Sequence, residues 1–170
     1  MANQKTGSQS IENMVDIDNT LASNVEGYET YGLLYDHKFS LSKTVGAGAG
    51  GLLDTSSKIE ATPLMIKIAS GIYISDMENK FINGTPFLKV TIAKLANING
   101  TNKVRETDVF QNCFILQMQP SNDQKTSMNF NTLTLRFTAY ENTVFAYDDL
   151  TGDLRGQNST SYDFSQNKLG

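Results

Sequence analysis

The sequence contains no tryptophan, one cysteine, one histidine and three prolines among 170 residues. Cys113 therefore has no partner for an internal disulfide, and together with His37 it provides too few ligands for a His/Cys metal site. The chain has no block of basic residues and a net charge of −4, which argues against binding to nucleic acid or to an anionic membrane. No apolar run approaches the roughly 18 residues that a membrane-spanning helix needs.

The composition is that of a globular protein rather than a disordered one. Hydrophobic residues make up 39% and charged residues 19%, and the length fits a single domain over residues 1–170. We expect residues 1–12 to form a mobile arm and residues 148–170 a polar C-terminal tail. The first residues lack the apolar core of a secretory signal, which predicts synthesis in the cytoplasm and export, if any, by a signal-independent route.

The clearest structural signal is a long β-hairpin. Val109–Met118 and Met128–Phe137 are rich in Phe, Ile, Leu and Thr, and the polar segment Pro120–Thr126 connects them. Met128 and Phe130 have one parity in the second arm, whereas Leu133 and the apolar residues after it have the other. A one-residue bulge near Asn131 is predicted to return both sets to one face.

Other segments complete a mainly β pattern with one helix. Strands are predicted at Met14–Asp18, His37–Thr44, Phe87–Leu95 and Thr143–Tyr147. Thr62 as a cap, Pro63 in the first turn and Gly71 as the end predict one helix. Asn83-Gly84 and Asn99-Gly100 predict tight hairpin turns. The predicted fold is an antiparallel β-barrel with one flanking α-helix.

Catalytic and cofactor motifs receive little support. Gly46, Gly48 and Gly51 fit the spacing of a dinucleotide-binding loop, but no amphipathic helix follows them and no βαβ unit surrounds them. A Cys–His nucleophilic pair of Cys113 and His37 is possible by count. A buried, inert thiol is the favoured interpretation, because Cys113 lies in the middle of a predicted strand.

The acidic residues give no stronger signal. Asp148, Asp149 and Asp153 lack the spacing of a calcium loop, and a solvated turn is the favoured interpretation. The carboxylates of Glu60, Asp76 and Glu78 are dispersed and form no recognisable acid/base pair. The sequence predicts no enzyme, no cofactor and no metal.

Several segments, taken in order, carry a resemblance to a known family. They are DHKFSLS (Asp36–Ser42) with the small-residue loop after it, KIEATPLMIKIASG (Lys58–Gly71), TDVF…QMQP (Thr107–Pro120), MNFNTLTLRF (Met128–Phe137) and YDFSQNK (Tyr162–Lys168). In this order the chain resembles the Hcp family (haemolysin-coregulated proteins), the tube subunits of bacterial type VI secretion systems.

The resemblance implies a β-barrel with a flanking helix that assembles into homohexameric rings, which stack into a hollow tube. Sheath, baseplate and spike proteins and effector proteins in the lumen would be its partners. It would be cytoplasmic before the sheath contracts and extracellular afterwards. The alternatives are a tail-tube subunit of a phage-like contractile particle, and a stand-alone β-barrel binding module.

Two assembly surfaces are expected on this basis. The loop from Lys43 to Ser57 is predicted to join stacked rings through the residues Gly46, Gly48, Gly50, Gly51, Leu52 and Leu53. In the long hairpin, Phe114, Leu116 and Met118 share one predicted face, whereas Cys113 and Ile115 share the other. A monomer buries only one face of such a strand, so the second face is predicted to contact a neighbour.

Overall fold

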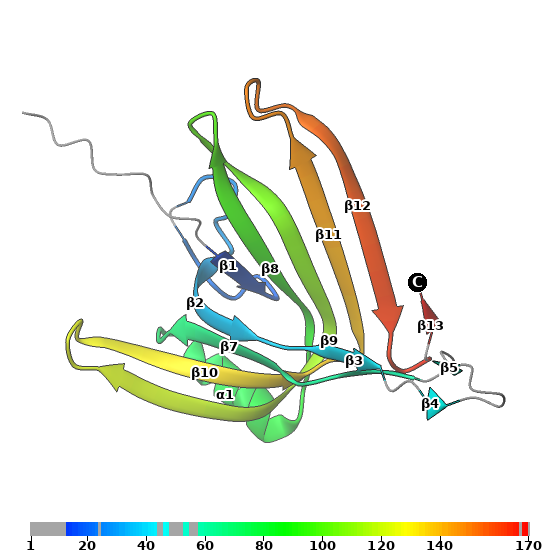
Figure 1. Cartoon of the computed structure of the whole chain (residues 1–170). Helices are drawn as coiled ribbons and strands as arrows, with labels where there is room; N and C mark the ends of the chain where they lie inside the picture. The colour runs from blue at the N-terminus through cyan, green and yellow to red at the C-terminus, as the bar shows by residue number, and fades with distance from the viewer. Residues whose placement is uncertain are drawn as a thin grey trace, which may run out of the picture.

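The computed structural model describes residues 13–23, 25–43, 46–47, 53–54, 58–166 and 168–169. Within these ranges the chain consists of antiparallel strands and one helix (Figure 1). The elements are β1 (Asn13–Ile17), β2 (Gly32–Lys38), β3 (Leu41–Lys43), β4 (Gly46–Ala47), β5 (Leu53–Asp54), β6 (Ile59–Ala61), β7 (Leu64–Ala69), α1 (Ile74–Asn83), β8 (Phe87–Ile98), β9 (Thr101–Asp123), β10 (Met128–Arg136), β11 (Ala139–Tyr147), β12 (Leu154–Asp163) and β13 (Lys168–Leu169).

The main sheet closes on itself through β9. Its strand order is β10-β7-β2-β1-β8-β9-β11-β12-β13, and β10 also pairs with β9. Six strands, β9, β10, β7, β2, β1 and β8, therefore form a closed ring. The length of β9 makes this possible, because Thr101–Cys113 pairs with β8 and Phe114–Asp123 pairs with β10. The structure confirms the predicted antiparallel barrel with one helix.

The barrel interior is apolar, and α1 contributes to it. In β7 and β10 the buried residues alternate with more exposed ones, as expected for strands with one face toward the core. Large, fully buried side chains of the barrel include Phe87, Phe110, Ile17, Leu64, Ile66, Ile68, Ile92, Leu133 and Leu135. Met77 of α1 is fully buried in the same cluster, and α1 packs against β9. No helix in the described ranges is long and apolar enough to cross a membrane.

The helix predicted from Thr62 to Gly71 is wrong. Leu64–Ala69 is strand β7, which lies between β2 and β10 and pairs with both. Its residues alternate between buried and exposed positions with period two, so the apolar run is a strand with one face in the core. The helix follows instead, as α1.

One of the two predicted Asn-Gly hairpin turns is confirmed. Asn99 and Gly100 have φ values of 51° and 79° and connect β8 to β9, as expected for a two-residue turn. The other prediction is wrong, because Gly84 ends α1. Its φ of 65° is left-handed, and its N–H group donates to the carbonyl of Phe81 at 3.3 Å.

The predicted bulge near Asn131 is also wrong, since the register of β10 is continuous there. Phe130 instead lies on the outer face of the barrel, where its ring contacts Tyr35 with 4.8 Å between the ring centroids. The actual register shift lies between Thr134 and Leu135, opposite Leu116 of β9.

This shift changes the prediction for the first arm of the hairpin. Phe114 and Leu116 remain 40% and 49% exposed on the outside, and Cys113 and Ile115 lie inside. Met118 was predicted to share the face of Phe114 and Leu116, but it packs against the core.

The polar C-terminal segment contributes a strand to the sheet. Leu154–Asp163 forms β12, which pairs with β11 along its length, and β13 pairs with its end. The sequence suggests only a polar tail here, because β12 is exposed along most of its length and therefore has no alternation of apolar and polar residues. The predicted arm of residues 1–12 lies outside the described residues.

Candidate assembly site

Two strand edges of the barrel are open to other chains. From Phe114 to Asp123, β9 pairs only with β10 within the described residues. Among the residues that the structure describes, β2 pairs only with β7 from Asp36 to Lys38, and β3 after it pairs only with β6. These edges bound the four-stranded wall β9-β10-β7-β2, which runs across the lower half of Figure 1. Unpaired N–H and C=O groups along a strand edge are a template for pairing with another strand.

The β9 edge has few features that would prevent such pairing. No charged residue occurs from Phe114 to Asn122. Gln117 and the residues from Gln119 to Asn122 are exposed, and one proline, Pro120, interrupts the edge. Monomeric proteins protect their edge strands with charges, prolines or bulges. A ten-residue edge with a single proline and half-exposed Phe114 is therefore suited to contact with a second strand.

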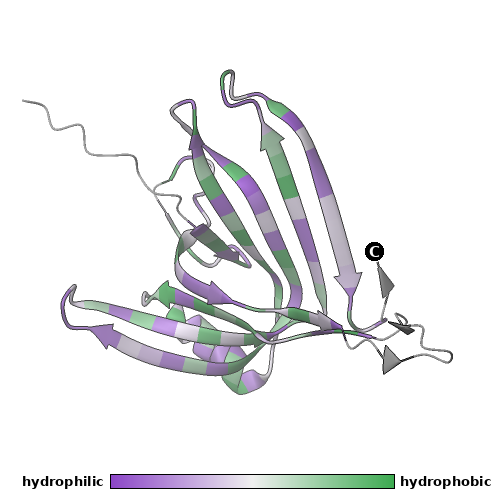
Figure 2. Ribbon diagram, viewed as in Figure 1, coloured by the Kyte–Doolittle hydropathy of each residue, from purple (hydrophilic) through white to green (hydrophobic). Residues whose placement is uncertain are grey.

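Hydrophobic and hydrophilic residues alternate along the strands of this wall (Figure 2). Lys67 lies 4.6 Å from the centroid of the Phe130 ring, and Tyr35 packs edge-on against the same ring. Around this aromatic pair the face is polar, with threonine and glutamine side chains of β9 and β10. The outer face of the wall therefore has one aromatic contact site, at Tyr35 and Phe130, and is hydrophilic around it.

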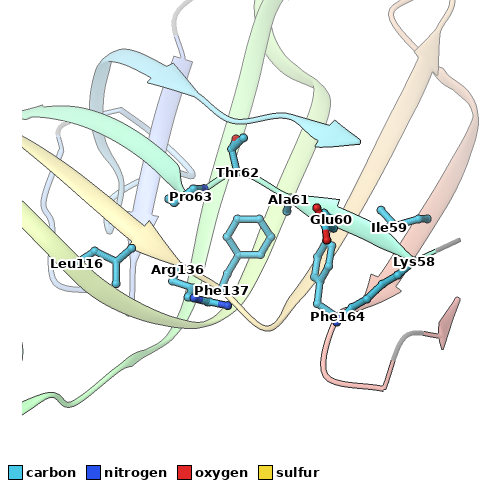
Figure 3. A pocket seen from close by; sticks show the side chains of 10 residues that line it. All are labelled: Lys58, Ile59, Glu60, Ala61, Thr62, Pro63, Leu116, Arg136, Phe137 and Phe164. Carbon is cyan, nitrogen blue, oxygen red and sulfur yellow. The ribbon is translucent and has the colours of Figure 1, made fainter. Parts of the chain in front are cut away.

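A hollow of about 330 Å³ lies at the corner where β6 leads into β7 (Figure 3). Phe137 and Phe164, with ring centroids 5.5 Å apart, form its apolar part. Lys58, Glu60 and Arg136 lie at its rim, and no ion pair joins them within the described chain. The hollow is therefore lined by aromatic rings, with charged side chains at its rim that form no ion pair with one another. Its described lining residues do not include a nucleophile paired with a general base.

A polar cluster occupies the inner face of β8, β9 and β11. Lys94 extends its ammonium group to Glu106 Oε1 and Asp108 Oδ2, both at 3.0 Å. Tyr140 donates to Asp108 Oδ1 at 2.7 Å, and the amide of Asn142 donates to Glu106 and Asp108 at 2.7 and 2.8 Å. The Asp108 side chain is only 1% exposed. Its Oδ2 atom accepts no hydrogen bond of good geometry. The negative charge on this atom is therefore compensated by the ion pair with the Lys94 ammonium group.

The electrostatics of the cluster follow from these contacts. Burial alone would lower the pKa of Lys94, but the bonds to Asp108 and Glu106 outweigh it and leave that pKa raised. Burial and the hydrogen bond to Asp108 raise the pKa of Tyr140. The cluster therefore keeps a charged lysine and a neutral tyrosine at neutral pH. Such an arrangement is typical of a structural network.

His37, the single histidine, lies on β2. Its strand partner in β7 is the fully buried Ile66. Burial lowers the pKa of His37, and the positive charge of Lys94 lowers it further, against weaker opposite effects of Asp108 and other carboxylates. Two residues later, Phe39 packs on Phe110 with 5.0 Å between the ring centroids.

The structure does not bring the other candidate residues of the sequence together. Cys113 is fully buried, and burial raises the pKa of its thiol to about 12, so the interpretation as a buried, inert cysteine is confirmed. Glu60 lies on β6, whereas Asp76 and Glu78 lie on α1.

The acidic segment after β11 is confirmed as a turn. Asp148 accepts the amides of Leu150 and Thr151, at 2.8 and 3.1 Å, and also pairs with Arg155. These bonds occupy the Asp148 carboxylate. Among the residues that the structure describes, no group of three His, Cys, Asp or Glu side chains is placed to hold a metal ion.

The predicted ring-stacking loop is only partly described. Gly46 belongs to β4 and Leu53 to β5, and these strands pair antiparallel beyond the β3–β6 ribbon. Gly48, Gly50, Gly51 and Leu52 lie outside the described residues. The ribbon that carries the loop is therefore defined, and the stacking role stays a prediction.

Sequence reasoning missed the Lys94 cluster. A usable signal was present, because Asp108 shares its parity with the buried Phe110, and Lys94 shares its parity with the buried Ile92. Charged residues at inward positions of two adjacent strands indicate a buried ion pair. The pairing of these strands was needed to recognise it.

The closed antiparallel barrel with one helix and an open four-stranded wall defines the fold class. No protein-family model and no curated protein sequence matches the chain. Solved structures do match in fold. A protein described as a type six secretion system protein aligns with a TM-score of 0.82 and 12% identity over 95% of this chain and 100% of that one.

Two further structures agree. Hcp1 from Salmonella typhimurium aligns with a TM-score of 0.72 and 15% identity over 95% of this chain and 100% of its own. A type VI secretion system effector from Yersinia pestis aligns with a TM-score of 0.66 and 10% identity over 89% and 98%. The chain has the Hcp fold over nearly its whole length, as the order of motifs in the sequence predicted.

Proposed function

We propose that this protein is the tube subunit of a type VI secretion system. Copies associate head to tail into six-membered rings, and the rings stack into a hollow tube. The observation that carries the proposal is the pair of open edges on the wall β9-β10-β7-β2. Because the β9 edge and the β2–β3 edge are different surfaces, the β9 edge of one copy can pair with the β2–β3 edge of the next. Such a heterologous contact gives a closed ring when the rotation between neighbouring copies adds up to a full turn.

The two edges are similar in length. The β9 edge runs from Phe114 to Asp123, and the β2–β3 edge runs from Asp36 to Lys43. Pairing between them satisfies backbone groups on both and continues the wall from one copy to the next. In a ring, the mixed polar face of this wall becomes a curved surface against which effector proteins are carried.

Export of the tube is the remaining part of the proposal. Sheath contraction expels the tube with its spike and its effectors, so the protein is cytoplasmic before firing and extracellular afterwards. The Hcp fold of the chain supports this, as does the existence of a protein of this fold described as a type VI secretion system effector. The role is structural, and no catalytic residue is assigned.

Assembly is tested by the mass of the particles. Size-exclusion chromatography with light scattering at micromolar concentration, followed by electron microscopy, should show rings of six copies. Gln117→Lys together with Gln119→Lys places two like charges on the β9 edge and should give monomers. The matched control, Asn79→Lys with Leu150→Lys, adds the same charge at exposed positions on α1 and in the β11–β12 turn, and it should leave the rings intact.

The alternatives predict different results. A strictly monomeric wild-type protein would contradict the ring and favour a stand-alone binding module. Rings that persist in the Gln117/Gln119 variant would show that the β9 edge is not the contact. A phage-like particle would give rings as well, but the protein would then reach the medium in free contractile particles rather than through an intact producing cell.

A further inference from the structure

The wall β9-β10-β7-β2 differs in charge from the rest of the chain. With its β9–β10 turn, it carries four of the 14 basic residues and two of the 18 acidic ones, although the whole chain has a net charge of −4. These residues are Lys38, Lys67, Lys125 and Arg136 against Asp36 and Asp123. The Asp123 carboxylate is engaged within the turn, where it accepts the Lys125 amide and the Thr126 hydroxyl, each at 3.0 Å. The wall is therefore positive on an otherwise acidic molecule.

Three of these cations lie around one apolar side chain on the outer face. Met65 and Lys67 of β7 point away from the core, because the residues that alternate with them are buried. Met65 is opposite Lys38 in the pairing with β2 and opposite Thr134 in the pairing with β10. Arg136 follows Thr134 on the same face of β10 and is exposed. Since diagonal neighbours on one face of a sheet are about 7–8 Å apart, Lys38, Lys67 and Arg136 surround Met65.

These three cations are not neutralised by carboxylates of their own chain. Among the residues that the structure describes, Lys38, Lys67 and Arg136 form no ion pair. Asp36 is opposite Lys67 in the strand pairing, but the Lys67 ammonium group lies over the Phe130 ring, 4.6 Å from its centroid. The three positive side chains are therefore available to carboxylates of another molecule.

Apolar contact points lie directly beside the cations. Met65 is 40% exposed, and its flexible thioether side chain can adapt to apolar groups of different shape. Tyr35, 43% exposed, packs on Phe130 and continues the apolar surface on the other side of Lys67. Pairing of the β2 edge with a neighbouring copy uses backbone groups, so the Lys38 side chain stays on the face, perpendicular to the sheet. One bound segment can thus contact cations and apolar groups together.

We propose that this face of the wall binds acidic segments of the exported effector proteins. Their carboxylates pair with Lys38, Lys67 and Arg136, and an apolar side chain between the carboxylates packs on Met65. The inference rests on the proposed function, because it specifies the chemistry of the cargo. Charge complementarity supports it, since the wall attracts an acidic partner that the rest of the chain repels. Each exposed ion pair is weak, but the copies in a ring repeat the site, and an effector with several acidic segments gains avidity.

Labelled peptides test the chemistry of the site on the full chain. The probe is a short fluorescein-labelled peptide in which glutamate alternates with leucine, and its binding is followed by fluorescence anisotropy. Matched peptides carry glutamine or lysine in place of every glutamate. The glutamate peptide should bind roughly tenfold more tightly than the glutamine peptide, as expected for a few exposed ion pairs. This preference should shrink as salt is added, because salt screens exposed charges.

Two double variants locate the site. Lys38→Gln with Lys67→Gln should weaken binding of the glutamate peptide by roughly two- to thirtyfold. The control, Lys89→Gln with Arg105→Gln, removes the same charge at exposed positions of β8 and β9 outside the wall and should leave binding unchanged. Charge reversal gives a gain that a misfolded protein would not show: Lys38→Glu with Lys67→Glu should bind the lysine peptide and reject the glutamate peptide.

Several results would overturn the proposal: equal binding of the glutamate and glutamine peptides, an equal loss in the control variant, or a reversed wall that does not bind the lysine peptide. Single-stranded DNA that binds as tightly as the glutamate peptide, and is lost in the Lys38/Lys67 variant, would show a general polyanion surface and also contradict it.

The outcome is separable from that of the proposed function. Rings that form but do not prefer the acidic peptide would refute the cargo chemistry and leave the tube subunit standing. A monomeric protein that binds the acidic peptide through Lys38 and Lys67 would contradict the ring and keep the assignment of the face.

Discussion

Ser40 and Thr62 are joined by three hydrogen bonds across the corner where two pairs of strands meet, one of them between their hydroxyl groups at 3.3 Å. The Ser40 N–H group donates to Thr62 Oγ1 at 2.8 Å, and the Thr62 N–H group donates to the Ser40 carbonyl at 2.9 Å. This closes the step from β2 into β3 against the step from β6 into β7. Thr62 thus has the hydrogen bond that a helix cap would make, but its partner lies 22 residues away.

Replacing Thr62 should weaken this corner. Thr62→Ala leaves the Ser40 amide without its side-chain acceptor, and we expect a loss of about 0.5–1.5 kcal/mol in the free energy of unfolding. Thr62→Ser keeps the hydroxyl and should cost less. Urea denaturation of the three proteins measures the difference. An equal loss in both variants would assign the effect to the methyl group rather than to the hydrogen bond.

Leu64 should be among the most sensitive positions in the barrel. It is fully buried on the inner face of β7, so Leu64→Ala should cost about 2–5 kcal/mol through lost burial and a cavity. Met65 is the control, because it is the next residue and is 40% exposed. Met65→Ala should cost less than about 1 kcal/mol. Similar denaturation midpoints for the two variants would contradict the strand assignment of this segment.

Lys94 should stabilise the fold by balancing Asp108. Lys94→Met leaves a nearly inaccessible carboxylate without its cation, and we expect a loss of about 3 kcal/mol at pH 7. Because the pKa of Lys94 is raised in the folded protein, its contribution is complete below its ordinary value of 10.5 and is lost as the pH rises through the folded value.

Urea denaturation at pH 7 and at pH 11 checks this prediction. The gap between the wild type and Lys94→Met should be large at pH 7 and narrower at pH 11. Lys58→Met removes an exposed lysine and serves as the control, with little effect at either pH. A gap that is small at pH 7, or unchanged at pH 11, would mean that the ion pair does not stabilise the barrel.

Leu52 and Leu53 are predicted to dock on the adjacent ring. Each contact is weak because ordering a Gly-rich loop costs about 1–2 kcal/mol per residue, but several copies around a ring act together. Leu52→Asp with Leu53→Asp should leave rings and thermal stability nearly unchanged and abolish stacked tubes and effector export. Electron microscopy and an export assay measure both effects.

A matched control exists where β11 turns into β12, at Leu150 of the turn and Leu154, the first residue of β12. Leu150 and Leu154 are 88% and 54% exposed, so Leu150→Asp with Leu154→Asp makes the same chemical change away from the loop. Tubes should form normally in this control. Unfolding or monomers in the Leu52/Leu53 variant would place those leucines in the core or the ring contact and refute the stacking role.

The parts of the fold that depend on local pattern were predictable. The hairpin of β9 and β10, the strand β8 and the Asn99-Gly100 turn follow from period-two alternation and from backbone preferences of a few adjacent residues. The burial of Cys113 follows from its place within an apolar strand. The order of weak motifs was enough to indicate the Hcp fold, because each motif reflects a segment with a defined role in the barrel.

Other features were decided by contacts between distant segments. Leu64–Ala69 has apolar residues compatible with a helix or a strand, and its position between β2 and β10 selects the strand by satisfying its backbone on both edges. The register of β10 places Phe130 on the outer face, where its ring packs against Tyr35 of β2. The packing of Phe39 against Phe110 and Tyr140 depends on the closure of the barrel, since these residues are far apart in the chain. Local propensity contributes tenths of a kcal/mol per residue, whereas pairing and burial contribute several, so tertiary contacts prevail where the two disagree.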